Sequence, residues 1–232
     1  MDDSDFKEFL AAVDRDGALA ETQARAEATM SRRGLFGLAL AGAGAVVLAR
    51  VPGAGAAALP ATDVNVLNYA LVLEYLQSSF YTEAERNGAL SGKTAAAAHV
   101  VGATERAHVR AFLDLLGSKA VKRPTFNFQG TTERQQPFLK TAIAFEDLAV
   151  AAYKGQAPKL RTNGVLAAAV GIHSVEARHA AWMRQLFGIT PAVNAFDKPA
   201  SRSQINRIVK STKFIVAKPK MTARKKKPKF TG

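Results

Sequence analysis

The sequence predicts an all-α fold: a four-helix bundle of two antiparallel helical hairpins joined by a long crossover. Apolar residues recur at three- and four-residue spacing in four segments between residues 64 and 187. Acidic, histidine and tyrosine residues then repeat in the same order in the first and second pairs of segments. A chain of 232 residues, 48% of them hydrophobic, can also bury a core of ordinary domain size.

The four helices are expected near residues 64–86, 93–116, 133–154 and 160–187. Asp63 is expected to cap the first helix and Thr132 the third, because side-chain oxygens of these residue types accept hydrogen bonds from the free N–H groups of a helix start. Each helix is followed by a glycine that is expected to end it: Gly88, Gly117, Gly155 and Gly188.

The crossover is expected at residues 118–131, which show no helical periodicity. Fourteen extended residues reach roughly 45 Å, whereas a 23-residue helix is roughly 35 Å long. The link can therefore run the length of the bundle, while the short joins on either side of it imply antiparallel neighbours. Two hairpins with one long crossover form the ferritin-like arrangement.

The two predicted hairpins carry the same chemical marks. In order, these are Glu74, Tyr81, Glu105 and His108 in the first hairpin, and Glu146, Tyr153, Glu176 and His179 in the second. Ten glutamates and four histidines placed at random would give roughly 0.2 Glu-x-x-His pairs, and two are present at matching places.

This pattern predicts a dinuclear metal site. Residues three apart share a helical face, so each Glu-x-x-His pair can hold an ion, and a glutamate from each remaining helix can complete or bridge the two. The candidate ligands are Glu74, Glu105, His108, Glu146, Glu176 and His179. Burying four carboxylates among apolar neighbours would be prohibitive unless two divalent cations neutralised them.

Oxygen and imidazole ligands suit iron or manganese and do not exclude zinc, and the absence of cysteine excludes thiolate sites. Two iron ions are therefore expected, with manganese or zinc as alternatives. His173 is expected to be peripheral rather than a third imidazole. Asp147 is expected either to orient a ligating histidine or to face solvent.

Four segments carry a family resemblance: "LNYALVLEYLQSSFYTEA", "ATERAHVRAFLDLL", "AIAFEDLAVAAY" and "IHSVEARHAAWMRQL". They resemble bacterioferritin- and rubrerythrin-type di-iron proteins, and more closely the ferritin-like family of plant desiccation-related and exported bacterial proteins. The resemblance spans residues 63–188. It implies that the four glutamates and two histidines above are ligands, and that Tyr81 occupies the place of a redox-active tyrosine. The chain departs from it at Gln77 and Thr104, where acids are common.

The resemblance implies redox chemistry, either oxidation of Fe(II) or reduction of peroxide, with dioxygen or peroxide as the partner. One alternative is a non-enzymatic desiccation or stress protein whose metal is structural or vestigial. A second is a mini-ferritin-like protein that binds DNA or another anionic polymer through a basic tail. The sequence leaves oligomeric assembly open.

Residues 1–58 are predicted to be a twin-arginine signal peptide with a long N-terminal region. Arg32–Arg33 precede 15 uncharged residues, Leu35 to Ala49, and small residues then offer cleavage after Ala56 or Ala58. The prediction implies export to the periplasm, cell envelope or extracellular space. The alternative is an uncleaved amphipathic or membrane-anchoring helix.

The ferritin-like domain is expected at residues 59–190, followed by an extension, 191–216, with a short helix capped by Ser201 or Ser203. Residues 217–232 are expected to form a basic, disordered tail. From residue 201 onward there are eleven Lys or Arg and no acid, within a chain of net charge +13. An exported protein would offer this tail to an anionic cell-wall polymer or lipid surface, whereas nucleic acid is not expected there.

Overall fold

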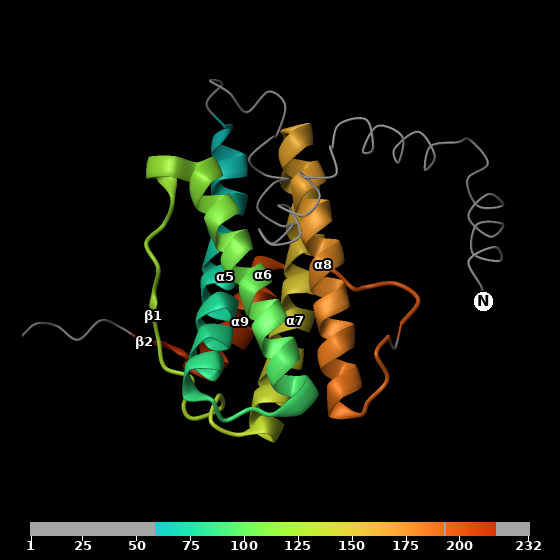
Figure 1. Cartoon of the computed structure of the whole chain (residues 1–232). Coiled ribbons are helices and arrows are strands. Elements are labelled where there is room, and N and C mark those ends of the chain that lie inside the picture. The colour runs from blue at the N-terminus through green and yellow to red at the C-terminus, as the bar shows by residue number, and fades with distance from the viewer. Residues whose placement is uncertain (1–58, 193, 217–232) are drawn as a thin grey trace, which may run out of the picture. The chain divides into compact units, whose positions relative to one another are not determined.

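Four long helices form an antiparallel bundle in the computed structural model, which describes residues 59–192 and 194–216 (Figure 1). They are α5 (Ala61–Asn87), α6 (Gly92–Leu116), α7 (Gln135–Gln156) and α8 (Asn163–Phe187). α5 packs mainly against α6 and α7 mainly against α8, with further contacts between α5 and α7 and between α6 and α8. The predicted all-α bundle of two hairpins is confirmed. The expected signal peptide, 1–58, and basic tail, 217–232, lie outside the described residues.

Asp63 does not cap α5, contrary to the prediction. Pro60 is the N-cap residue of α5, and Asp63 lies in the first turn of the helix. Its carboxylate instead accepts hydrogen bonds from the backbone N–H groups of Arg161, at 2.8 Å, and Thr162, at 3.0 Å. These residues lead into α8, so Asp63 stabilises the start of a helix about 100 residues away. Sequence proximity indicated the wrong helix because the two helix starts are neighbours only in the folded bundle.

Thr132 does not cap α7 either. The N-cap residue of α7 is Arg134, and no side chain caps it. The Thr132 hydroxyl donates to Glu83 Oε1 at 2.8 Å and accepts from Asn87 Nδ2 at 3.0 Å. Thr132 is buried, and these bonds attach the end of the crossover to the last turns of α5.

Gly155 was expected to end α7 but lies inside it, because α7 continues to Gln156. A Cβ atom on Gly155 would lie 2.0 Å from the carbonyl oxygen of Ala200. The Ala200 N–H group also donates to the Ala151 carbonyl at 3.0 Å. The glycine therefore permits close approach of the segment after α8. By contrast, Gly88 and Gly188 end their helices as predicted, with φ of 63° and 84°.

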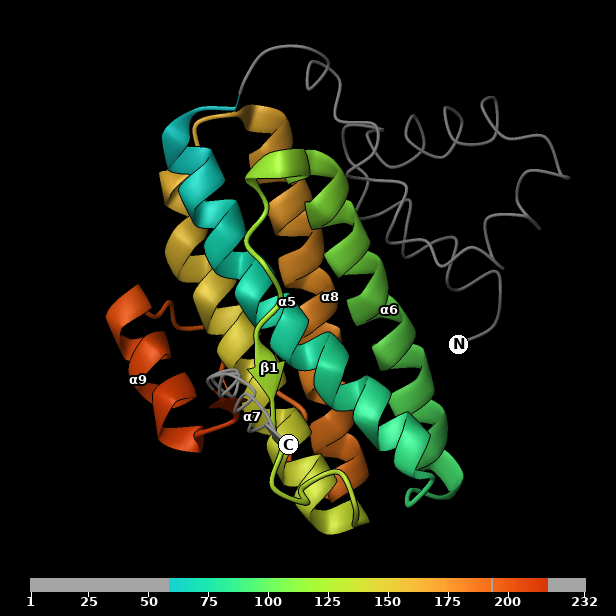
Figure 2. The ribbon, with the colours of Figure 1, turned by 90° about the vertical axis from the view of Figure 1, so that its left-hand side faces the viewer.

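The crossover and the C-terminal extension meet on the α5–α7 side of the bundle (Figure 2). Strand β1 (Thr125–Phe126) pairs antiparallel with β2 (Ile215–Val216). Helix α9 (Arg202–Thr212), which follows α8 and precedes β2 in the chain, packs against α7. Ser201 caps α9 through a complete capping box with Gln204, which confirms the predicted short helix. Single 3₁₀ turns, η1 (Gly117–Lys119) and η2 (Ala157–Lys159), follow α6 and α7.

Two buried apolar clusters fill the bundle. The phenylalanine cluster includes Phe80, Phe128, Phe138, Phe145 and Phe214. The aliphatic cluster includes Val66, Leu67, Leu71, Val165 and Ile172. Along α5, Leu71 belongs to the aliphatic cluster and Leu76 to the phenylalanine cluster, so the residues between them lie where the two clusters meet.

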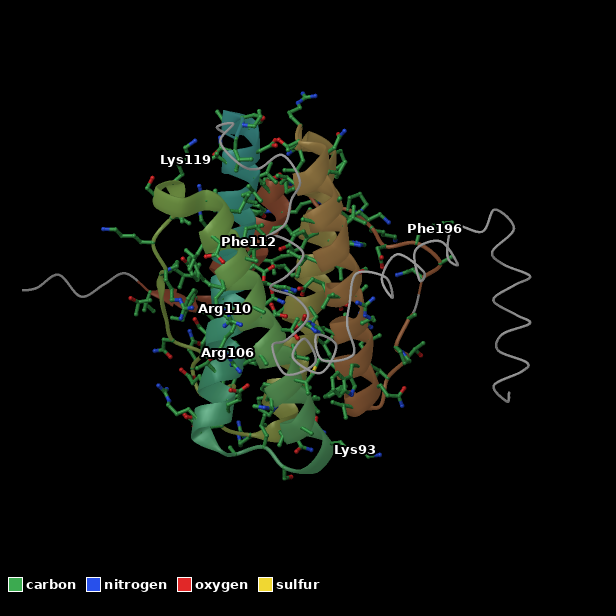
Figure 3. The ribbon with its side chains drawn as sticks, turned by 45° about the horizontal axis from the view of Figure 1, so that its top comes forward. Lys93, Arg106, Arg110, Phe112, Lys119 and Phe196 are labelled. Atoms are coloured by element: carbon green, nitrogen blue, oxygen red, sulfur yellow. The ribbon has the colours of Figure 1, made fainter. Side chains whose placement is uncertain are left out.

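Basic side chains follow α6 along its length: Lys93, Arg106 and Arg110 on the helix and Lys119 in η1 (Figure 3). Phe196 extends from the segment between α8 and α9 and is 82% exposed (Figure 3). Within residues 59–192 and 194–216, no helix has both the length and the apolar content that a membrane span requires.

Candidate metal centre

All six predicted ligands meet in the middle of the bundle. Each helix contributes at the level where the two apolar clusters meet: Glu74 from α5, Glu105 and His108 from α6, Glu146 from α7, and Glu176 and His179 from α8. The four carboxylates are fully buried and the two imidazoles nearly so. Apolar residues about one helical turn from these side chains are buried as well: Val101, Phe112, Ala142, Val150, Ile172 and Met183.

The six residues form two overlapping sets. The Glu74 group consists of Glu74, Glu105, His108 and Glu176, and the Glu146 group of Glu105, Glu146, Glu176 and His179. Within each group, one candidate ligand atom per residue lies within 4.8 Å of all the others. Glu105 and Glu176 belong to both groups, so these two carboxylates are placed to bridge two cations.

Five of the six residues have a buried ligand atom without a hydrogen-bond partner among residues 59–192 and 194–216. These atoms are Glu74 Oε2, both Glu105 oxygens, Glu176 Oε1, His108 Nδ1 and His179 Nδ1. They are nevertheless close together: His108 Nδ1 lies 3.2 Å from both Glu74 and Glu176, and His179 Nδ1 lies 3.0 Å from Glu105. Buried polar atoms are rarely left without partners, and oxygen and imidazole donors suit iron, manganese or zinc. The cluster therefore fits bound metal ions.

Burial and mutual attraction set the charge of the cluster. Burial raises the pKa of Glu74 to about 7 and that of Glu146 to about 8, because a carboxylate away from water is costly. Burial alone would lower the pKa of His179, but the carboxylates of Glu105 and Glu146, 3.0 Å and 3.5 Å from its Nδ1 atom, raise it to about 10. The pKa of Glu105 would also rise on burial, yet the two histidines lower it to about 2. The metal-free cluster thus retains protons at neutral pH that cations would displace.

Two tyrosine hydroxyls hold the outer carboxylates across the bundle. Tyr81 of α5 donates to Glu146 Oε1 of α7 at 2.5 Å, and Tyr153 of α7 donates to Glu74 Oε1 of α5. Burial and the adjacent carboxylates raise the pKa of both tyrosines well above its usual range, so both remain protonated donors. Tyr81 and Tyr153 therefore both contact the six-residue cluster directly through their hydroxyls.

Gln77 takes part in the site in a way that the sequence did not reveal. Its amide nitrogen donates to Glu146 Oε2 at 3.2 Å and to Glu176 Oε2 at 3.1 Å. The equivalent position in the second hairpin is Ala149, so the other outer carboxylate, Glu74, has no matching donor from α7. Two signals pointed to position 77: it shares a helical face with Glu74, three residues earlier, and the family resemblance has an acid commonly there.

Three other residues lie outside the cluster. His173 is near Asp197, with Nε2 3.9 Å from Oδ2, and is peripheral as expected. Asp147 forms an ion pair with Arg184 at 2.5 Å and orients no ligating histidine. Thr104 donates to the Val100 carbonyl of its own helix. The departure from the family pattern at Thr104 therefore changes no contact with the ligands.

Comparison with known proteins supports the same architecture. A family model described as "Ferritin-like domain" matches residues 62–188, which include all six cluster residues and nearly all of α5 to α8. No curated protein matches the chain. The finer resemblance to desiccation-related proteins stays a prediction.

Proposed function

The chain belongs to the ferritin-like domain family, and we propose that its buried cluster holds two iron ions and uses them in redox chemistry, with oxidation of Fe(II) as the reaction. One observation carries the proposal: two four-residue groups share Glu105 and Glu176, and every member except Glu146 has a buried ligand atom without a hydrogen-bond partner among the described residues. Manganese or zinc would fit the same donors, so the choice of iron rests on the family and on the redox function.

Two bound iron ions would supply a two-electron couple, which balances the reduction of one dioxygen with two protons to hydrogen peroxide, or of one peroxide with two protons to two waters. Glu105 and Glu176 would help to hold both ions, because they belong to both groups, whereas His108 would serve the Glu74 group and His179 the Glu146 group. The apolar clusters around the six residues exclude bulk water.

Tyr81 is the proposed redox-active side chain. Its hydroxyl contacts the outer ligand Glu146 directly, and its ring is fully buried. If dioxygen or peroxide, acting through the bound ions, takes one electron from Tyr81, the phenol proton has an acceptor in Glu146, to which the hydroxyl is already hydrogen-bonded. The arrangement therefore gives Tyr81 both an electron route to the metals and a proton acceptor.

The test is metal analysis of the purified full chain together with aerobic Fe(II) oxidation. We expect about two ions per chain, and we expect both Glu105→Ala and Glu176→Ala to lose both ions because these carboxylates belong to both groups. Glu133→Ala removes an exposed glutamate outside the cluster and serves as the matched control. Wild type that binds no metal overturns the proposal, and wild type that binds two ions without oxidising iron restricts it to a structural metal protein.

Export is a separate part of the proposal and rests on the Arg32–Arg33 pair and the apolar run after it. Cell fractionation of wild type and of Arg32→Lys/Arg33→Lys checks it, with loss of export expected in the variant. The basic residues 217–232 are proposed to bind an anionic cell-wall polymer or lipid surface. Deletion of 217–232 should abolish salt-sensitive binding to anionic vesicles, and unchanged binding would contradict this role.

A further inference from the structure

The two hairpins carry the same proposed ligands at equivalent positions, but the apolar residues packed around those ligands differ. Residues of α7 follow their α5 counterparts by 72 positions, as Glu146 follows Glu74 and Tyr153 follows Tyr81. On this alignment, three phenylalanines around Tyr81 have smaller counterparts around Tyr153. Phe80 corresponds to Ala152, Phe138 to Val66, and Phe145 to Leu73.

Aromatic rings fill the Tyr81 end. The Phe80 ring stacks on Phe138 at 5.1 Å between centroids and meets Phe145 edge-on at 5.1 Å. Tyr81 in turn contacts Phe138 edge-on at 5.8 Å. All four rings belong to the phenylalanine cluster.

The Tyr153 end contains a cavity. All three smaller counterparts line it, together with Tyr153, Ile172 and Phe112, the last on α6 (Figure 3). Its volume is about 20 Å³, and its lining is almost wholly apolar. A cavity needs roughly 10–15 Å³ of such space for one water molecule, so this one admits a molecule of about two heavy atoms. The cavity is thus the space left where the other half of the repeat has phenylalanines.

The cavity lies next to the Glu74 group: its lining includes direct neighbours of that group but none of its four residues. Tyr153 lines it and donates its hydroxyl hydrogen bond to Glu74. Leu73 precedes Glu74 in the chain, and Phe112 follows His108 by one helical turn. Glu74 Oε2 is without a hydrogen-bond partner, whereas both oxygens of Glu146 at the other end are engaged by Tyr81 and Gln77.

Helix α9 covers the other end of the cavity. Arg202, its first residue, lies over the ring of Tyr69 at 4.6 Å and donates to Gln156 Oε1 at 3.0 Å. Tyr69 and Gln156 both line the cavity, and Tyr69 is only partly buried. A molecule arriving from solvent would therefore pass Arg202 and Tyr69 before it reaches Tyr153.

We propose that this cavity binds dioxygen and conducts it to the Glu74 group, which makes the two ends of the cluster functionally different. The inference rests on the proposed redox function. The size and chemistry of the cavity favour dioxygen. A small apolar molecule breaks no hydrogen bonds to water when it enters an apolar lining, whereas hydrogen peroxide would lose its hydrogen bonds to water there. Among the residues that the structure describes, no charged side chain lines the cavity, which argues against a carboxylate or phosphate as its ligand.

Xenon binding tests the cavity without any metal. We expect one xenon atom in the cavity in crystals of the metal-free full chain under xenon pressure. Leu73→Phe restores the phenylalanine found at the equivalent position, Phe145, and should abolish this binding. Val64→Phe makes a similar addition on the same helix at a residue that does not line the cavity, and should retain it. An empty cavity in wild type, or xenon still bound in Leu73→Phe, would overturn the proposal.

Oxygen-dependent kinetics test the route. Initial rates of Fe(II) oxidation are measured against dissolved dioxygen for wild type, Val66→Phe and Val64→Phe. Val66 lies two helical turns before Glu74, so Val66→Phe should raise the KM for dioxygen several-fold while peroxide-driven oxidation and the number of bound Co(II) ions stay unchanged. An unchanged KM for dioxygen would refute the route. Wild type that binds no metal defeats the proposed function instead, and xenon then still decides whether the cavity takes a gas-sized molecule.

Discussion

The Glu74 end and the Glu146 end of the cluster have equivalent ligands in different surroundings. Each end has an outer glutamate, a histidine and a tyrosine that donates to the glutamate across the bundle. At the Glu146 end, Gln77 adds a second donor and three phenylalanines fill the space around Tyr81. At the Glu74 end, Ala149 replaces the glutamine and a cavity replaces the rings.

The comparison shows which features a duplicated sequence keeps. The proposed site requires its six positions in both halves, because each lost carboxylate or imidazole would remove a bond to an ion. Packing around the ligands can diverge, because the core tolerates many apolar combinations of suitable volume. Two ions in such a site are therefore not expected to be equivalent.

Packing gives the largest expected difference between the two ends. Phe80→Ala should lower the free energy of unfolding by about 3–5 kcal/mol, because Phe80 is fully buried and contacts four other rings. At the equivalent position in the second hairpin, Ala152→Val should lower the free energy of unfolding by less than about 1.5 kcal/mol, because the added methyl groups enter the cavity. Urea denaturation of the metal-free protein measures both. Equal losses would mean that the two ends are packed alike.

The next largest difference is expected in the pH dependence of metal binding, because each end releases protons when an ion binds. At the Glu146 end the protons come from Glu146, with pKa about 8, and from His179, with pKa about 10. At the Glu74 end they come from Glu74, with pKa about 7, and from His108, whose pKa, despite burial, Glu74 and the other carboxylates hold well above its usual range. Each displaced proton changes affinity by up to about tenfold per pH unit. From pH 7 to pH 8, each histidine should therefore raise the affinity of its end by about tenfold, and Glu146 should add a larger further rise than Glu74, because Glu74 is already about half ionised at pH 7. Calorimetric titration with Mn(II) checks this, and two steps of equal pH dependence would contradict it.

The same pKa shifts predict the stability of the metal-free protein. The pKa of Glu146 is raised from 4.5 to about 8, so the unfolded chain ionises first and stability falls as pH rises between these values. The raised pKa of His179 acts in the same direction, because the stability present below 6.5 is lost as pH rises toward 10. Metal binding should therefore raise the melting temperature more at pH 8 than at pH 6.

Gln77 should affect only one ion. Gln77→Leu removes the donor to Glu146 and Glu176 and should weaken the Glu146-end ion by about 10- to 100-fold, the usual effect of losing a hydrogen bond to a ligand. Glu176 also serves the Glu74 group, but its Oε1 atom, which faces His108, is not bonded to Gln77. Stepwise Co(II) binding followed by absorption measures the two ions separately. Equal weakening of both steps would show that Gln77 acts on the whole cluster.

The sequence predicted the helices and the six-residue cluster because both depend on short spacings. Periodicity placed four helices, and i, i+3 geometry paired each glutamate with its histidine. The register between helices followed only from the duplication: once Glu74 and Glu146 occupy equivalent places, the pairs Glu105–His108 and Glu176–His179 must face each other.

Features that depend on contacts between distant segments were not predicted. Asp63 was assigned to its own helix but caps the approach to α8. The sequence predicts that Gly155 ends the third helix, although in the fold this glycine lies inside α7 and makes room for Ala200. The cavity was also not predicted. Val66, Leu73 and Ala152 are ordinary apolar core residues in the sequence, and their small size shows only when they are compared with the phenylalanines at the equivalent positions in the other hairpin.

The smallest expected difference separates the two tyrosines. Tyr81→Phe and Tyr153→Phe each remove one hydroxyl from an outer glutamate, so both should weaken metal binding to a similar, modest degree. If Tyr81 is the redox-active side chain, Tyr81→Phe alone should also slow Fe(II) oxidation by roughly two- to fivefold, which corresponds to about 0.5–1 kcal/mol of barrier. It should also abolish any tyrosyl radical signal in rapid-freeze paramagnetic resonance spectra. A radical that persists in Tyr81→Phe and disappears in Tyr153→Phe would instead assign the redox role to the end that faces the cavity.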